Sequence, residues 1–189
     1  ARMDELPFGE LPPVESGPYV ADENVVAEPA EPSSPPRWWL VGALLLFDLP
    51  AVIERARTNW PADLAGRIHF ATGNFFESIV PGGDAYQMRH IIHDWNDQQC
   101  QTILKHVHRA MPDHARLLII ETVIPEGNEP CFGKLLDLTM LTIPGGLERT
   151  ADEYRELLAG AGFRIAQIVP TAGDVSVIVQ KALAKDPGQ

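Results

Sequence analysis

The sequence predicts an α/β fold: an open, mostly parallel sheet with helices on both faces. The first observation is that strand-length apolar runs alternate with segments of helical periodicity. The second is that two capping boxes mark helix starts, Asn96 with Gln99 and Thr150 with Glu153. The third is a pair of strand-like segments near the end of the chain. The short turn over 170–174 would join them as an antiparallel hairpin at the edge of the sheet.

Residues 1–37 differ in composition from the rest of the chain. They hold 8 of the 17 prolines, and eight acidic residues against two arginines. Such a segment buries too little apolar area to offset its chain entropy. We therefore predict an irregular, acidic tail over 1–37, one domain over 38–182 and a flexible end over 183–189.

The first half of the domain is predicted to contain three strands and two helices. The apolar run 44–47, followed by Asp48 and Pro50, is typical of a buried strand leading into a helix over 51–57. Further strands are expected over 67–72 and 84–89. The box at Asn96 begins the most regular helix of the sequence, which ends at Pro112. Its apolar residues recur at helical spacing (Cys100, Ile103, Leu104, Val107 and Met111).

The second half continues the alternation of strands and helices. Residues 116–120 are nearly all apolar, as in a parallel strand buried on both faces. The largely apolar segment 131–143 is predicted to be helical. Thr150 caps the next helix, with an apolar stripe and Gly162 near its carboxyl end. Residues 163–169 and 175–179 are the two strands of the expected hairpin.

Composition and charge narrow the class of protein. The formal charge of −11 and the pI near 4.9 argue against a nucleic-acid binder, because affinity for phosphates comes from clustered Lys and Arg. The longest apolar run, 38–47, is about half the length of a membrane span. Cys100 and Cys131 lie too far apart to suggest a disulfide framework, and Cys100 fits simple packing in a helix. These features predict a cytoplasmic protein with no nucleic-acid or membrane partner.

Polar residues follow two of the predicted strands, where open α/β sheets bind their ligands. The carboxylate of Asp48 suits the hydroxyls of a ribose, but the same residue type also caps helices, here at Pro50. The segment 73–76 (GNFF) could hold a flat base. A turn with a packed pair of phenylalanines is the alternative.

Two histidines flank the end of the strand predicted over 84–89. His93 is the candidate proton acceptor, because histidine titrates near neutral pH, and the alternative is a capping or packed ring. Metal binding would need more ligands than His90, His93 and Asp94. None with recognisable spacing is present, so no metal is expected.

Two acids are candidates to orient that histidine. Glu121 ends the strand 116–120, and Glu148 precedes the helix capped by Thr150. Either carboxylate could accept an N–H bond from the ring of His93 and raise its basicity. Each acid alone is more often a surface or capping residue. We predict that Glu121 or Glu148 lies within hydrogen-bond reach of His93.

Six segments together resemble a known family, the S-adenosylmethionine-dependent O-methyltransferases. This family includes plant caffeate enzymes, hydroxyindole O-methyltransferases and bacterial polyketide-tailoring enzymes. The resemblance runs from about Leu45 to Val179, and six linked motifs in order are far more specific than any single one. The segments are 47–50 (FDLP), 73–76 (GNFF), 93–95 (HDW), Glu121, 137–141 (DLTML) and 145–150 (GGLERT).

The resemblance implies a Rossmann-like methyltransferase sheet and S-adenosylmethionine as the methyl donor. It implies a small hydroxyl-bearing acceptor such as a phenol, no metal, and the homodimer usual in the family. His93 would be the base, flanked by Glu121 and Glu148. The cofactor-binding residues would be Asp48 for the ribose, Asn74 and Phe75 for the adenine, and Arg89 along the cofactor. Met140 and Asp94 would bind the acceptor.

The sequence departs from the family pattern in two places. Residues 38–47 contain a single glycine, Gly42, where the family has a first strand ending in a glycine-rich loop, and the N-terminal dimerisation domain has no counterpart. Asn74 stands where an acid is usual. We therefore expect an incomplete sheet with unpaired strand edges and exposed apolar faces, and weak cofactor binding. The alternative function is a non-catalytic binding or interaction module. A dinucleotide oxidoreductase is disfavoured because no G-x-G-x-x-G loop is present.

Overall fold

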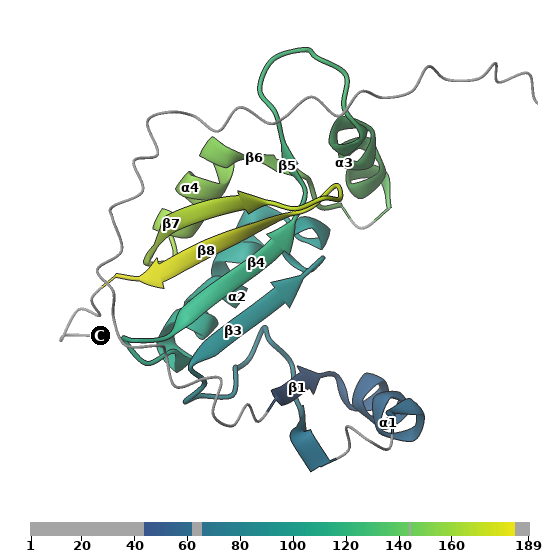
Figure 1. The fold of residues 1–189 in the computed structure, drawn as a ribbon, viewed down its shortest axis with the longest axis vertical. Helices are drawn as coiled ribbons and strands as arrows, with labels where there is room; N and C mark the ends of the chain where they lie inside the picture. The colour runs from purple at the N-terminus through teal and green to yellow at the C-terminus, as the bar shows by residue number, and fades with distance from the viewer. Residues whose placement is uncertain (1–43, 62–65, 144, 184–189) are drawn as a thin grey trace, which may run out of the picture.

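The computed structural model describes residues 44–61, 66–143 and 145–183 (Figure 1). The expectations for 1–43 and for 184–189 lie outside these ranges. The described elements follow the predicted alternation of strands and helices. In chain order they are β1 (Leu44–Asp48), α1 (Pro50–Asn59), β2 (Ile68–Thr72), β3 (Ala85–Arg89), η3 (Ile92–Asp94), α2 (Asp97–Ala110), β4 (Arg116–Glu121), β5 (Val123–Ile124), α3 (Phe132–Thr142), β6 (Arg149–Thr150), α4 (Ala151–Ala159), β7 (Phe163–Pro170) and β8 (Ser176–Ala182).

The strands form three sheets within the described residues (Figure 1). The largest has the order β3-β4-β8-β7, in which β3 and β4 are parallel. As predicted, β7 and β8 form an antiparallel hairpin, and β8 also pairs antiparallel with β4. The parallel pairs β1-β2 and β5-β6 are separate small sheets. Three of the five strand pairings in the described residues are parallel, so the mostly parallel arrangement with an antiparallel hairpin is confirmed, although it is divided among three sheets.

The core lies between the four-stranded sheet and the helices α2 and α4. Leu104 and Val107 of α2 pack in one cluster with Leu117 and Ile119 of β4, all fully buried. Burial along β4 alternates, so its apolar run is not buried on both faces. That prediction was wrong because, among the described residues, α2 and α4 cover this sheet from one side (Figure 1).

The two capping boxes form as the sequence predicts. Asn96 accepts a hydrogen bond from the backbone of Gln99 at the start of α2, and Thr150 does the same for Glu153 at the start of α4. Asp48, by contrast, does not cap α1. The N-cap residue is Leu49, whose own N–H donates to the Asp48 carboxylate at 2.7 Å. The capping alternative for Asp48 is therefore wrong.

Several apolar side chains of the described region are exposed. Leu44 and Leu45 of β1 are 58% and 44% exposed, so the prediction of a buried strand was wrong. The physical reason is that β1 has β2 as its single partner strand in the described region. Unpaired edges with exposed apolar residues are what an incomplete sheet predicts. Apolar side chains along α3 are exposed as well (Phe132, Leu135, Leu138 and Leu141).

Among the described helices, none combines the length and apolar character that crossing a membrane requires.

Candidate active site

The chain turns sharply between the end of β3 and η3, and Glu121 at the end of β4 holds this turn. His90 adopts the left-handed conformation, with a φ of 50°, and its N–H donates to the Ile120 carbonyl at 3.2 Å. Glu121 Oε1 then accepts the N–H groups of Ile91 and Ile92 at 2.8 and 2.9 Å. One buried carboxylate oxygen therefore fixes the backbone that carries His93.

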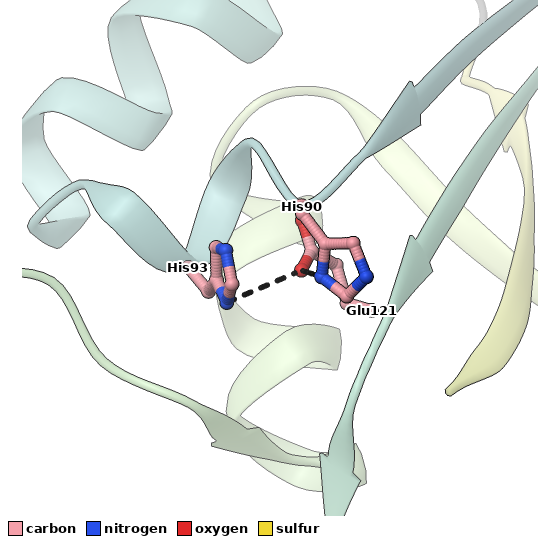
Figure 2. Close-up of side chains that lie close together, drawn as sticks. All are labelled: His90, His93 and Glu121. Atoms are coloured by element: carbon pink, nitrogen blue, oxygen red, sulfur yellow. Dashed lines mark ion pairs between the residues drawn. The ribbon is translucent and has the colours of Figure 1, made fainter. Parts of the chain in front are cut away.

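His93 contacts both predicted acids. Its Nδ1 lies 2.7 Å from Glu148 Oε1 and 3.7 Å from Glu121 Oε2. The predicted hydrogen bond is thus confirmed for Glu148, whereas Glu121 lies just beyond hydrogen-bond distance (Figure 2 shows His93 with Glu121). An ionised carboxylate only accepts, so this bond places a proton on Nδ1 and leaves the lone pair of a neutral ring on Nε2.

The surroundings shift the pKa values of these groups. Burial lowers the pKa of His93, but the hydrogen bond to Glu148 and the charges of Glu121 and Glu148 outweigh burial and raise it above 6.5. Burial raises the pKa of Glu121 to about 7, against the lowering effects of His93 and the two backbone N–H donors. Burial and the neighbouring His93 lower the pKa of His90. The site therefore favours a proton on His93 over one on His90.

The loop that carries Glu148 lies directly against the backbone of His93. The Leu147 N–H donates to the His93 carbonyl at 2.9 Å, and the Glu148 N–H donates to Asp137 Oδ1 of α3 at 2.8 Å. A Cβ atom at Gly146 would lie 1.9 Å from the His93 carbonyl oxygen, so only glycine fits this approach. The GGLERT motif therefore needs its second glycine for packing, a role that sequence reasoning missed.

Arg149 is a second residue whose role sequence reasoning missed. Its guanidinium is buried and donates to the carbonyls of Ile92, Trp95 and Leu147. It also pairs with Asp97 at 2.8 Å. These bonds join the loop before Glu148 to both ends of η3. In the sequence Arg149 is one charged residue beside a capping box, and no pattern marks it as buried.

Three of the four residues expected to bind the cofactor, Asp48, Asn74 and Phe75, lie at or just after the carboxyl ends of β1 and β2. Asp48 is in register with Thr72, and the Gly73 N–H donates to the Asp48 carbonyl at 3.0 Å. Asn74 Oδ1 accepts the Phe76 N–H at 3.0 Å, which confirms the predicted turn. Phe75 packs edge-on against Phe76 and Trp95, which places this turn beside the segment that follows His93.

The other residues expected to bind the cofactor or the acceptor, Arg89, Asp94 and Met140, come from three different segments of the chain. Arg89 ends β3 with its side chain exposed. Asp94 Oδ1 lies 3.5 Å from His93 Nε2, whereas Met140 contributes its carbonyl to the N–H groups of Gly145 and Gly146. A cavity of about 240 Å³ between α4 and β7 includes Arg155 in its lining and none of the predicted site residues.

Comparisons with known proteins agree on one family. Residues 41–164 match the sequence profile of the O-methyltransferase domain. The chain is 44% identical over 135 residues to the phenazine O-methyltransferase PhzM of Lysobacter antibioticus, which covers 71% of this chain and 40% of that protein. The crystal structure of LaPhzM superposes with a TM-score of 0.71 at 42% identity, over 74% of this chain and 42% of that one. The structure of human N-acetylserotonin methyltransferase, solved in complex with SAM, superposes with a TM-score of 0.68 at 30% identity, over 74% of this chain and 40% of that one. The chain thus spans about two-fifths of the length of these relatives.

Proposed function

This chain belongs to the O-methyltransferase family, and we propose that it takes part in methyl transfer from S-adenosylmethionine to the hydroxyl of a small aromatic molecule, with His93 as the base. The observation that carries this proposal is the 2.7 Å contact between His93 Nδ1 and Glu148 Oε1. A histidine that only packs in the core does not need two buried carboxylates beside its ring, whereas His93 has Glu121 from the end of β4 and Glu148 from the loop before β6. Glu148 and Glu121 are both fully buried, and both have an oxygen near this nitrogen.

The proposed chemistry is removal of the acceptor's proton by His93. A phenol has a pKa near 10 and is a poor nucleophile while it keeps its proton. With Nδ1–H bound to Glu148, the Nε2 lone pair takes this proton as the acceptor oxygen bonds to the methyl carbon. S-adenosylmethionine supplies the methyl group on a sulfonium, and the bond that breaks leaves a neutral thioether. A positioned base of this kind contributes roughly 10²–10⁴-fold to the rate.

The turn after β2 and the end of β1 would hold the donor. Asp48 keeps an oxygen for the ribose hydroxyls, since one hydrogen bond to Leu49 occupies Oδ1. Asn74 and Phe75 would contact the adenine, and Arg89 would lie along the donor. On the acceptor side, Asp94 lies beside Nε2 and Met140 would line the pocket. The residues proposed to bind the methyl donor offer carboxylate, amide and aromatic groups, and these groups suit a nucleoside.

Replacement of His93 tests this proposal. The chain is incubated with S-adenosylmethionine and a panel of phenols, and methylated products are measured by mass spectrometry. We expect His93→Ala to lower the rate roughly 10²–10⁴-fold while calorimetric binding of S-adenosylhomocysteine stays the same. His69→Ala, on the exposed side of β2, is the matched control and should keep wild-type activity. Wild-type activity in His93→Ala would contradict the role of His93. Ligand binding without any product from the wild type would favour the non-catalytic alternative.

The pH dependence gives an independent test of the same base. The pKa of His93 is raised above 6.5, and only the neutral ring accepts a proton. The value of kcat/KM should therefore rise with pH, with a midpoint above 6.5. In Glu148→Gln the midpoint should move to lower pH, because the hydrogen bond to the carboxylate is lost. A midpoint below 6.5 in the wild type would refute this assignment.

A further inference from the structure

Two histidines and one glutamate converge on a single point within the candidate active site. His90 Nδ1 lies 3.8 Å from Glu121 Oε2, and His93 Nδ1 lies 3.7 Å from the same oxygen (Figure 2). The centroids of the two imidazole rings lie 5.2 Å apart, with the ring planes tilted by 37°. One ligand atom from each of the three residues falls within 4.8 Å of the others. From the sequence we expected no metal, because no further ligand with recognisable spacing accompanies His90, His93 and Asp94. The fold brings Glu121 to this point from another strand.

Glu121 offers this point an oxygen with no other partner. Its Oε1 accepts two backbone N–H groups, but its Oε2 is fully buried and makes no hydrogen bond. Glu148 Oε2 is also buried without a partner. A buried carboxylate oxygen with no partner is costly, and a cation removes that cost.

We propose that His90, His93 and Glu121 bind a divalent transition-metal ion, with Zn²⁺ as the best match. Zinc takes imidazole nitrogen and carboxylate oxygen at about 2.0–2.2 Å, so neighbouring ligand atoms lie roughly 3.3 Å apart in a tetrahedral site. The observed separations of 3.7 and 3.8 Å from Glu121 Oε2 need a contraction of about half an ångström. The ligand atoms of the two histidines lie within 4.8 Å of each other, so that pair needs a contraction of up to about 1.5 Å. The side chain of His90 is 39% exposed and has room to move. Mg²⁺ and Ca²⁺ prefer all-oxygen ligands and fit less well.

Metal binding would also inhibit the proposed reaction. An ion on Nδ1 of His93 replaces the proton given to Glu148, and the remaining ring proton then occupies Nε2. The nitrogen proposed to accept the acceptor's proton is thereby blocked. This consequence rests on the proposed function, whereas the binding of the ion does not.

Titration of the full chain with Co²⁺ and Zn²⁺ tests the site directly. Visible absorption of Co²⁺ reports tetrahedral coordination, and calorimetry with Zn²⁺ gives the stoichiometry and the dissociation constant. We expect one ion per chain with nitrogen and oxygen ligands. His90→Asn should weaken binding by at least about tenfold, because even outer partners of a metal ligand contribute 10–100-fold. Asparagine suits this position because it tolerates a positive φ.

The controls separate this site from other metal ligands. His69→Asn removes an exposed histidine of β2 and should leave the dissociation constant unchanged. Glu121→Gln keeps an acceptor for the two backbone N–H groups and should weaken binding as His90→Asn does. Equal binding by wild type and His90→Asn would overturn the proposal, as would a thiolate charge-transfer band from Cys131. If Glu121→Gln fails to fold, His90→Asn alone still decides. If the metal-free chain shows no methyl-transfer activity but still binds one ion at this site, that result would contradict the proposed function and leave the metal site standing.

Discussion

Replacing Gly146 by alanine should separate Glu148 from His93. The new Cβ would lie 1.9 Å from the His93 carbonyl oxygen and 2.5 Å from the Asp94 carbonyl carbon, both of them backbone atoms. Real Cβ contacts do not fall below 3.0 Å, so the two backbones must move apart by about 1 Å. The 2.9 Å bond from the Leu147 N–H to the His93 carbonyl cannot survive that shift.

The consequences can be given magnitudes. Loss of that hydrogen bond alone costs about 1 kcal/mol in the free energy of unfolding. A misplacement of about 1 Å at a catalytic group costs on the order of 10²-fold in rate, or roughly 2.7 kcal/mol of transition-state stabilisation. The pKa of His93 should also fall, because the hydrogen bond to Glu148 raises it against the effect of burial.

The assay is a pH titration of the histidine side chains by nitrogen-detected NMR, alongside urea unfolding and product formation. The NMR readout does not depend on turnover, so it works even if activity is low. Gly66→Ala is the matched control, because a Cβ there meets nothing within 4 Å. An unchanged pKa of His93 in Gly146→Ala, with unchanged stability, would refute the reasoning.

Three further predictions concern charge and stability. The free energy of unfolding of the wild type should fall by up to about 3 kcal/mol as pH rises from 4.5 to 7. The reason is that the folded-state pKa of Glu121 is raised from 4.5 to about 7, so the fold favours the protonated carboxyl. Urea unfolding across this pH range measures the fall, and Glu121→Gln should lack the part that comes from this residue. Arg149→Met should lose about 3 kcal/mol of unfolding free energy, because it leaves the three carbonyls of Ile92, Trp95 and Leu147 without their donor. Arg155→Met, at a half-exposed surface pair, should lose less than about 1 kcal/mol. Similar losses in both variants would contradict the role of the buried hydrogen bonds. Calorimetric binding of S-adenosylhomocysteine should be weaker than micromolar, because Asn74 lacks a charge and β1 and β3 lie in separate sheets; a micromolar dissociation constant would contradict this expectation.

Local signals in the sequence were sufficient for most of the elements. The capping boxes at Asn96 and Thr150 place the starts of α2 and α4, because the side chain and the backbone it binds lie three residues apart. The apolar spacing of α2 likewise predicts which of its residues are buried. The pairing of β7 with β8 follows from the short turn between them. All these features depend on neighbours in the chain, so the sequence alone determines them.

The burial of strands depends on the fold as a whole. Leu44 and Leu45 look like core residues, yet they are exposed because β1 has β2 as its one neighbouring strand in the described region. The run over β4 is apolar on both faces, but α2 and α4 cover one of them. A hydrophobic run indicates which surface can be buried, and its neighbours in space determine whether it is.

The candidate site shows the same division. The sequence identified His93, Glu121 and Glu148 as residue types suited to proton transfer, and the family resemblance gave them roles. Only the tertiary structure brought Glu148 to 2.7 Å and Glu121 to 3.7 Å from one imidazole nitrogen, and decided which acid makes the hydrogen bond. Glu121 lies 28 residues and Glu148 lies 55 residues after His93 in the chain, so no local sequence pattern encodes how close either acid comes to the imidazole. The close approach at Gly146 and the buried bonds of Arg149 depend on backbone atoms distant in sequence, which no pattern of residue types records.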